Sequence, residues 1–429
     1  MLTASIRCSL VALVCSTAAL SVRVDPLREA PDAKEIKQLI QEYLELDARS
    51  LEGMKQQDEI FARLDELPPL TDRDRKKWSS EITKRWAKGD KLVKKSGRHY
   101  FWEDGKKGLY IVGGESKRPK GLFIGMHGGG VGSGDAGSSA SAWSSAASAQ
   151  DWVGIFPEVL EKTERGWTDS GTEEWVMELI EQACRTWKID RDRVFFGGHS
   201  MGGYGTWTLG AHHADRVAAL TPSAGAPTPV RDAEGSLIDI EEGVIPNLRN
   251  VRVVIYQSDD DPNVPPDANR AAVQALESAQ ARWGGYDFEY WEVSGRKHEL
   301  PPGGTTDFLA RVADRRRDAR PEKLVWQPVL EWKRQFYWLW WDEPLRNAIV
   351  VAELDHESNE VRIESEQSVK GLHVLLDEEL LDLSREVVVL VNGEERYRGV
   401  PVPRLSVLLA TGGGIDPART YVARIPVGG

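Results

Sequence analysis

Through the middle of the chain, short runs of β-branched and aromatic residues alternate with segments of helical spacing. A hairpin-like pair comes first, at 99–102 and 109–112. Buried-type strand runs follow at 121–126, 152–156, 194–196, 217–220, 251–256 and 288–293. Helical patterns separate several of them, for example at 175–187 and 268–283. Strands that alternate with helices of this length predict a mostly parallel sheet with helices on both faces, which is a doubly wound α/β fold.

The two ends of the chain have different patterns. Apolar residues near helical spacing predict a helical extension over 30–95, broken at Pro68-Pro69. Beyond about residue 345, short β-type runs and the hairpin signal Asn392-Gly393 predict a small all-β domain over 345–429. The α/β unit between these parts is predicted to span 96–343.

Residues 131–150 interrupt the α/β pattern. They are almost all Gly, Ser and Ala, and Trp143 is their only large side chain. This composition favours a mobile loop beside the glycine-rich turn at 127–130. Such a loop is either a lid over a site or a disordered insertion.

Two charged or titratable clusters are better explained by structure than by chemistry. Arg315-Arg316-Arg317 lies between two aspartates, as is typical of a solvated helix face. His212 and His213 stand at the end of the helical pattern that starts near residue 201. We expect both histidines to be solvated or to cap that helix.

Tryptophans gather in one stretch near the predicted domain boundary. The stretch contains Trp326, Trp332, Trp338, Trp340 and Trp341. Tryptophan faces stack on sugars, so a carbohydrate-binding surface is one interpretation. Trp332, Phe336 and Trp340 fall at helical spacing, however, which favours packing between the two domains.

Composition limits the classes of partner. The chain has 429 residues, of which 41% are apolar and 28% are charged, as in a soluble globular protein. Its net charge of −12 and its pI near 5.4 argue against nucleic acid or an anionic membrane surface as a partner. The sequence does not indicate an oligomeric state.

The first twenty residues have the pattern of a secretory signal. Arg7 precedes an apolar run over 10–20 that contains the small residues Thr17, Ala18 and Ala19. A run of this length is too short to span a bilayer. We therefore expect a signal peptide over 1–20 and a secreted or periplasmic protein.

Cysteine usage follows from that expectation. Cys8 and Cys15 fall within the expected signal peptide, so Cys184 is the one cysteine of the mature chain. It lies inside a helical pattern, where a buried core cysteine is expected and a thiol nucleophile is not. An intramolecular disulfide is then impossible.

One short motif carries the strongest chemical signal. The strand run at 194–196 ends in glycines, and Gly198-x-Ser200-x-Gly202 stands at its junction with a helical pattern. This is the nucleophile-elbow pattern of serine hydrolases, in which the serine occupies a strained strand-to-helix turn. The residues two before and two after the serine need almost no side chain. Because the motif also arises by chance, its value depends on partners elsewhere in the chain.

An acid is expected after the strand run at 251–256, because the partners of the serine follow it in the order acid, then His. The chain offers Asp259, Asp260 and Asp261 there. We favour Asp261, which stands three residues before Val264-Pro265. A turn rich in Asp and Pro with only structural duties is the alternative.

A base is expected in the loop after the last strand of the α/β unit. His298 lies in that loop, and it is the only histidine C-terminal to the aspartates within the α/β region. Backbone donors for an oxyanion are expected from the N–H of Met201 and from Gly129 or Gly130 in the turn that begins at His127. His127 is expected to fix this turn.

The motif around Ser200 resembles that of a known group of enzymes. Arg193-Val-x-x-x-Gly-x-Ser-Met-Gly-Gly-Tyr-Gly-Thr-Trp207 is similar to the elbow of α/β-hydrolase esterases related to polyhydroxybutyrate depolymerases and feruloyl esterases, often labelled predicted peptidases. The resemblance covers about residues 105–310. It implies Ser200, Asp261 and His298 as a catalytic triad, with Met201 and the Gly129 region as the oxyanion hole.

The chain also departs from that group. Such enzymes usually carry His-Gly where this chain has Gln257-Ser258. The segment at 131–150 and the terminal extensions lie outside the pattern as well. These departures concern the substrate rather than the type of reaction.

Three functions remain open from the sequence. The leading hypothesis is hydrolysis of a carboxylic ester, including a carbohydrate-linked one, by a secreted enzyme that needs no metal or organic cofactor. The second is a serine peptidase of the prolyl-oligopeptidase type, although the N-terminal segment is too short for a propeller. The third is a carbohydrate-binding or scaffold protein with a degenerate site.

Overall fold

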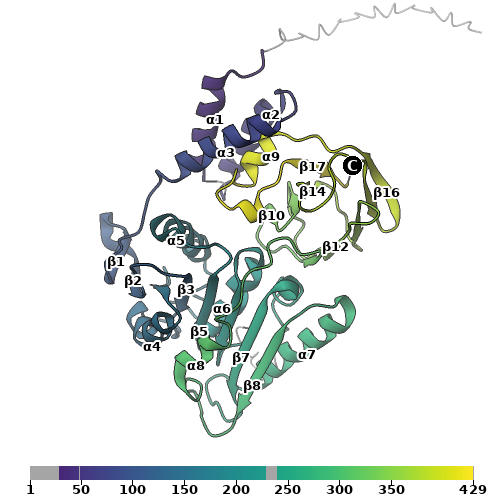
Figure 1. Cartoon of the computed structure of the whole chain (residues 1–429). Coiled ribbons are helices and arrows are strands. Elements are labelled where there is room, and N and C mark those ends of the chain that lie inside the picture. The colour runs from purple at the N-terminus through teal and green to yellow at the C-terminus, as the bar shows by residue number, and fades with distance from the viewer. Residues whose placement is uncertain (1–28, 48, 229–238, 429) are drawn as a thin grey trace, which may run out of the picture.

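The computed structural model describes residues 29–47, 49–228 and 239–428, so the expected signal peptide over 1–20 lies outside the described residues. An eight-stranded sheet forms the centre of the α/β part, with the strand order β1-β2-β4-β3-β5-β6-β7-β8 (Figure 1). In that order the strands are β1 (Gly97–Trp102), β2 (Lys107–Gly114), β4 (Trp152–Pro157), β3 (Gly121–Met126), β5 (Val194–His199), β6 (Ala219–Ser223), β7 (Arg252–Ser258) and β8 (Phe288–Val293).

Most of this sheet is parallel. β1 and β2 form the predicted antiparallel hairpin, and β2 pairs antiparallel with β4. From β4 to β8 every neighbouring pair is parallel. The predicted doubly wound α/β arrangement is confirmed.

Helices cover both faces of the sheet because successive strand residues point to opposite sides. In β5, Val194 and Phe196 join one hydrophobic core, whereas Phe195 joins the other. The first core includes residues of α5 (Thr172–Trp187), α6 (Met201–His212) and α7 (Asp267–Trp283). The second includes residues of α4 (Ala136–Ala149) and α8 (Gly304–Ala310).

Three N-terminal helices lie beside the C-terminal part of the chain (Figure 1). They are α1 (Ala33–Glu45), α2 (Leu51–Asp65) and α3 (Asp72–Trp86), and they pack near α9 (Leu405–Ala410). Arg404 Nη1 donates to the carbonyl oxygens of Asp65 (3.1 Å) and Leu67 (3.2 Å), and the Ser406 hydroxyl donates to the Asp65 carboxylate. The helical extension is therefore anchored to the chain's other end.

Two smaller sheets make up the C-terminal β region. One has the order β10 (Gln335–Phe336), β11 (Leu339–Trp341), β14 (Leu372–Leu376) and β17 (Ala423–Pro426). The other has the order β16 (Glu394–Gly399), β15 (Val387–Val391), β13 (Glu360–Glu364), β12 (Val350–Asp355) and β9 (Lys323–Trp326). Strands of these sheets thus begin at Lys323, about twenty residues before the boundary expected at 343–345. Short 3₁₀ turns lie at Asp104–Lys106, Ala214–Arg216, Pro246–Asn250 and Pro417–Arg419.

The expectation of a mobile loop over 131–150 is wrong for most of that segment. Residues 136–149 form α4, whose N-cap Asp135 accepts the backbone N–H of Ser138 at 2.8 Å. Trp143 is fully buried against Phe123. The small side chains let the helix approach the sheet closely, since a Cβ added at Gly113 would overlap the Ser144 hydroxyl. A helix of Ala and Ser has no apolar stripe for sequence reasoning to find.

The expectation of a solvated helix face at 315–317 is wrong for the helix and for Arg317, whereas the side chains of Arg315 and Arg316 are exposed as expected. The segment is not helical, and the side chain of Arg317 is only 1% exposed. Its guanidinium pairs with Asp192 at 2.7 Å and with Asp416 at 3.0 Å. Arg316 beside it is 52% exposed. Arg317 therefore joins the α/β part to the C-terminal region.

His212 and His213 are not solvated. The ring of His213 is 2% exposed and that of His212 is 10% exposed. His212 Nδ1 bonds the buried carboxylate of Glu173 in α5 at 2.9 Å, and His213 Nε2 lies 3.0 Å from the same carboxylate. Burial lowers the pKa of His213 to about 4, which keeps its ring neutral near pH 7.

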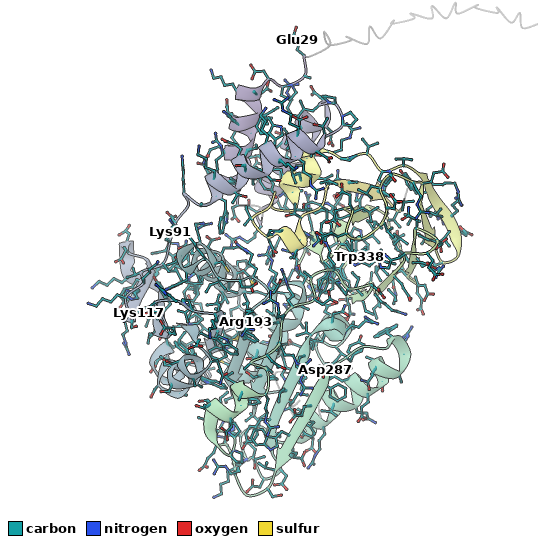
Figure 2. The ribbon with its side chains drawn as sticks, viewed as in Figure 1. Glu29, Lys91, Lys117, Arg193, Asp287 and Trp338 are labelled. Carbon is teal, nitrogen blue, oxygen red and sulfur yellow. The ribbon has the colours of Figure 1, made fainter. Side chains whose placement is uncertain are left out.

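The tryptophan-rich stretch is packed inside the protein, although it is not helical. Trp338 lies within the C-terminal β region (Figure 2). Four of the five tryptophans, Trp326, Trp338, Trp340 and Trp341, are at most 3% exposed, so their faces are not available to sugars. Trp332 is half-buried and lies beside His213, with ring centroids 5.8 Å apart. The interpretation as packing holds for the four buried tryptophans. No helix within the described residues is long and apolar enough to cross a membrane.

We expect Arg317→Ala to destabilise the protein strongly, because it leaves Asp192 and Asp416 without their shared cation. Removing one partner of a buried ion pair costs about 3–5 kcal/mol. The matched control is Arg316→Ala, where the exposed side chain should change the free energy of unfolding by less than about 0.5 kcal/mol. Urea unfolding of both variants checks this. Equal losses would show that the contacts of Arg317 contribute little.

Candidate active site

The turn between β5 and α6 holds Ser200 in a strained backbone conformation. Its φ is 61° and its ψ is −126°, a region that residues with a Cβ rarely adopt. The flanking glycines make the turn possible. A Cβ at Gly198 would overlap the carbonyl of Gly202, and a Cβ at Gly202 would overlap the carbonyl of Met126. The predicted strand-to-helix elbow is therefore present, at the carboxyl end of a central strand.

The strand order and this elbow together decide the fold. The chain is an α/β-hydrolase in fold. Ligands of such open sheets bind outside the carboxyl ends of the strands, where Ser200 lies.

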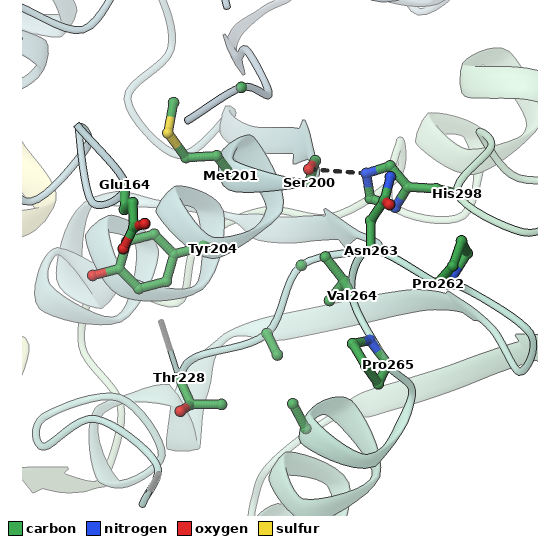
Figure 3. A pocket seen from close by; sticks show the side chains of 14 residues that line it. Glu164, Ser200, Met201, Tyr204, Thr228, Pro262, Asn263, Val264, Pro265 and His298 are labelled. Atoms are coloured by element: carbon green, nitrogen blue, oxygen red, sulfur yellow. Dashed lines mark hydrogen bonds between the residues drawn. The ribbon is translucent and has the colours of Figure 1, made fainter. Parts of the chain in front are cut away.

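The structure brings Ser200, His298 and Asp261 together in one chain of hydrogen bonds. His298 Nε2 lies 2.9 Å from Ser200 Oγ, and His298 Nδ1 lies 2.7 Å from Asp261 Oδ2. Figure 3 shows the contact between the serine and the imidazole. The carboxylate of Asp261 is fully buried, whereas the His298 ring is 19% exposed. This arrangement lets His298 take a proton from Ser200 while Asp261 fixes the ring's tautomer.

The three neighbouring aspartates have different contacts. Asp261 also accepts the backbone N–H groups of Asn263 (2.8 Å) and Val264 (3.0 Å), which fix its carboxylate. Asp259 instead accepts a hydrogen bond from the Ser294 hydroxyl at 2.6 Å. The side chain that contacts His298 is thus the one favoured from the sequence.

Asp260 and Ser258 connect the acid loop to the His298 loop, a role that the sequence analysis missed. Asp260 Oδ1 accepts the Ser258 hydroxyl (2.7 Å) and the backbone N–H of Lys297 (2.9 Å). The Ser258 hydroxyl oxygen in turn accepts the backbone N–H of Arg296 at 3.1 Å. These bonds fix the backbone immediately before His298. Ser258 is part of the departure from His-Gly noted in the sequence.

The glycine-rich turn after β3 packs against the elbow. A Cβ at Gly128 would lie 2.9 Å from the carbonyl oxygen of His199 and 3.1 Å from Ser200 Cβ. Gly129 has a φ of 142° and lines the cavity beside Ser200, as does Met201. Gly130 is not among the lining residues. Of the two glycines expected to donate to an oxyanion, Gly129 is therefore the one that faces the cavity.

His127 fixes this turn through hydrogen bonds of its ring. Its Nδ1 bonds the carbonyl of Gly128 at 2.8 Å, and its Nε2 accepts the backbone N–H of Val159 at 3.2 Å. Trp167 Nε1 donates to the His127 carbonyl at 3.2 Å. Burial lowers the pKa of His127, so the neutral ring that these two bonds require is favoured.

Ser200 and His298 open onto a cavity of about 660 Å³ (Figure 3). One part of its wall is apolar, formed by Ala226, Pro262, Val264, Pro265 and Ala268. The other part is polar and includes Glu164, Tyr204 and Thr228. The Tyr204 hydroxyl is held by Thr168 at 2.9 Å and donates to Glu241 at 3.1 Å. The wall thus offers both apolar and hydrogen-bonding contacts to a ligand. Within the described residues, no group of three or more His, Cys, Asp and Glu is placed to hold a metal ion.

His199, which precedes the serine, packs against the imidazole of His298. The two ring centroids are 4.7 Å apart, and His199 Nδ1 lies 2.9 Å from the Ser223 hydroxyl. Burial, followed by the neighbouring His298, lowers the pKa of His199 to about 4. Because the His199 ring is uncharged, it does not repel the positive charge that His298 acquires when it acts as a general base.

Comparisons with known proteins gave distant relatives. No family model matches the chain. The chain is similar to the bifunctional acetylxylan esterase/xylanase of Neocallimastix patriciarum, with 26% identity over 183 aligned residues. That similarity covers 36% of this chain and 25% of the relative. The chain thus spans only a quarter of that curated relative.

Solved structures of esterases are also similar to parts of this chain. A thermostable esterase has a TM-score of 0.40 and 18% identity, and the match covers 52% of this chain and 63% of that one. A CE1 ferulic acid esterase from Anaeromyces mucronatus has a TM-score of 0.39 and 14% identity, and the match covers 54% of this chain and 94% of that one. Est1E from Butyrivibrio proteoclasticus has a TM-score of 0.37 and 17% identity, and the match covers 50% of this chain and 98% of that one. The assignment of the fold rests on the strand order and the elbow rather than on these scores.

We expect His199 to stay neutral in the folded protein down to about pH 5. Its folded pKa of about 4 lies below the ordinary value of 6.5, so the unfolded chain binds this proton more tightly. The stability that His199 contributes is complete above pH 6.5 and is lost as pH falls towards 4. An NMR titration of its ring, assigned with His199→Gln, checks this. A midpoint near 6.5 would show that burial does not disfavour the charged form of His199.

Proposed function

We propose that this chain hydrolyses carboxylic esters through Ser200, His298 and Asp261. The observation that carries the proposal is the unbroken chain of hydrogen bonds from Asp261 to Ser200, at 2.7 Å and 2.9 Å, at the edge of a cavity. The distant similarity to an acetylxylan esterase/xylanase supports it. The strained elbow adds further support, because strain at a site is retained where the surrounding structure requires it.

In the proposed mechanism Ser200 Oγ attacks the ester carbonyl while His298 Nε2 takes its proton. His298 then donates that proton to the leaving alcohol, and an acyl-enzyme on Ser200 remains. Water attacks the acyl-enzyme with His298 again as base, which releases the acid and restores the serine. Asp261 holds Nδ1–H of His298 and stabilises the charged ring. The backbone N–H groups of Met201 and Gly129 are the proposed donors to the oxyanion.

The two kinds of wall favour an ester with one apolar and one hydroxylated part. The proline-rich wall at Pro262 and Pro265 suits an apolar group, and the side with Glu164 and Tyr204 suits hydroxyl groups. A carbohydrate-linked ester has both. A serine peptidase of the prolyl-oligopeptidase type remains the second candidate, and comparing a nitrophenyl ester with a prolyl anilide separates the two. The burial of four of the five clustered tryptophans speaks against a carbohydrate-binding scaffold.

We further infer export of the chain from the signal-like pattern over 1–20. Sequencing the N-terminus of the exported protein checks it. An N-terminus that retains residues 1–20 would contradict this inference.

Asp261→Asn should lower kcat by about ten-thousandfold, because the amide no longer fixes the ring's tautomer or stabilises its charge. Asp260→Asn should lower kcat by up to about a hundredfold, because the backbone before His298 is then held less firmly. Asp259→Asn is the matched control and should change kcat by less than about threefold. Steady-state kinetics on a nitrophenyl ester, with Ser200→Ala as blank, measure all three. Equal losses for Asp259→Asn and Asp261→Asn would contradict the assignment.

Glu164→Gln should improve the hydrolysis of esters that carry a carboxylate relative to neutral esters. Two like charges about 4 Å apart in water repel by roughly 1 kcal/mol, which corresponds to about a fivefold change in kcat/KM. The control is Glu161→Gln, because Glu161 is exposed and does not line the cavity. Matched anionic and neutral esters provide the measurement. An unchanged ratio in Glu164→Gln would mean that Glu164 does not face the bound substrate.

A further inference from the structure

A second cavity, of about 200 Å³, lies where three parts of the chain meet. Its walls come from the N-terminal helices, from the segment around His213 and Arg216 after α6, and from the C-terminal region including Lys333 and Arg419. It shares no lining residue with the cavity at Ser200. The proposed hydrolysis gives this cavity no role.

The wall of this cavity is strongly cationic. Arg49, Arg216, Lys333, Arg334 and Arg419 all line it. No aspartate or glutamate is among the described residues that line it. Carboxylates stand behind the wall instead. Glu173, for example, contacts His213 at 3.0 Å without reaching the cavity.

The carboxylates behind the wall are shared between cations. Asp215 pairs with both Lys333 (2.7 Å) and Arg419 (2.6 Å). Glu181 pairs with Arg216 (2.9 Å) and also with Arg191 (2.7 Å). Arg334 pairs with Asp58 (2.6 Å), and Arg49 pairs with Asp47 (2.8 Å). Each cation of the wall thus has a carboxylate partner, but none of these carboxylates lines the cavity.

Two of the arginines retain unused donors. Arg334 is 8% exposed and Arg419 is 6% exposed, and the Nε of each has no hydrogen-bond acceptor among the described residues. A buried N–H of a charged group without an acceptor is costly. Guanidinium groups present their donors in a planar fork that matches the oxygens of phosphate, sulfate or carboxylate.

The crowding of positive charge also affects Lys333. Burial lowers the pKa of Lys333 to about 8; Asp215 acts in the opposite direction, and the neighbouring Arg419 and Arg216 add to the effect of burial. Burial lowers the pKa of Arg419 as well. An anion in the cavity would favour the charged forms of both side chains.

We propose that this cavity binds a small multivalent oxyanion of the size of phosphate or sulfate. The volume is large enough for such an ion, and the unused guanidinium donors supply its hydrogen bonds. The cationic side chains face the cavity without a lining carboxylate, so they supply the counter-charge. Because the wall is built from three parts of the chain, the bound anion links the helical extension to the α/β part and the C-terminal region. It stabilises the folded chain by mass action.

The test is calorimetric titration and thermal unfolding of the full chain with sodium phosphate and sodium sulfate, against sodium chloride at equal ionic strength. We expect saturable binding of one anion and a higher Tm than in chloride. Ser200→Ala should bind the anion as tightly as the wild type, which separates this site from the Ser200 cavity. The absence of saturable binding beyond chloride, or its loss in Ser200→Ala, would overturn the proposal.

Arg49 locates the site, because its side chain is 36% exposed and its replacement is compatible with folding. Arg49→Gln should weaken anion binding about tenfold, the effect of losing one charged donor. Arg49→Lys should retain part of the affinity. Arg118→Gln makes the same change of charge at an exposed arginine outside the cavity and should bind as the wild type. Equal affinity in Arg49→Gln and Arg118→Gln would place the anion elsewhere and overturn the proposal.

Discussion

The backbone at Ser200 is the constraint on which the candidate site depends. A residue with a side chain is held at a φ of 61°, between a strand and a helix that both lie in the core. The backbone around Gly198 and Gly202 leaves no space for a Cβ at either position. Gly128, in the neighbouring turn, packs against Ser200. The sheet and its helices fix this geometry, so the serine hydroxyl reaches the cavity without any movement of the chain.

The partners of the serine are held with similar rigidity, although they come from loops. Asp261 is fixed by two backbone N–H groups, and the backbone before His298 is fixed by Ser258 and Asp260. Every group in this chain of contacts is oriented by another contact. Such preorganisation is what acyl transfer requires, because misplacement by about 1 Å costs a large factor in rate.

The sequence predicted the parts of the molecule where local pattern and tertiary structure agree. The strand at 121–126, the elbow and the order of Ser200, Asp261 and His298 follow from apolar runs, glycine spacing and chain order. It failed where side chains carry no pattern or where distant charges meet. The helix at 136–149 lacks an apolar stripe, and the burial of Arg317 depends on Asp416, about a hundred residues away. The strand at 323–326 was not predicted as part of the C-terminal sheets, because its pairing with 350–353 is set by residues far along the chain.

The proposed chemistry depends on Ser200 being an acyl-transfer nucleophile that His298 activates. Mass spectrometry after treatment with a fluorophosphonate tests it most directly, because this reagent reacts with an activated serine and not with an ordinary one. We expect one adduct per chain, located on the peptide that contains Ser200. The adduct should be absent in Ser200→Ala and form much more slowly in His298→Ala. No adduct on the folded wild type, or equal labelling of Ser200→Ala, would contradict the claim.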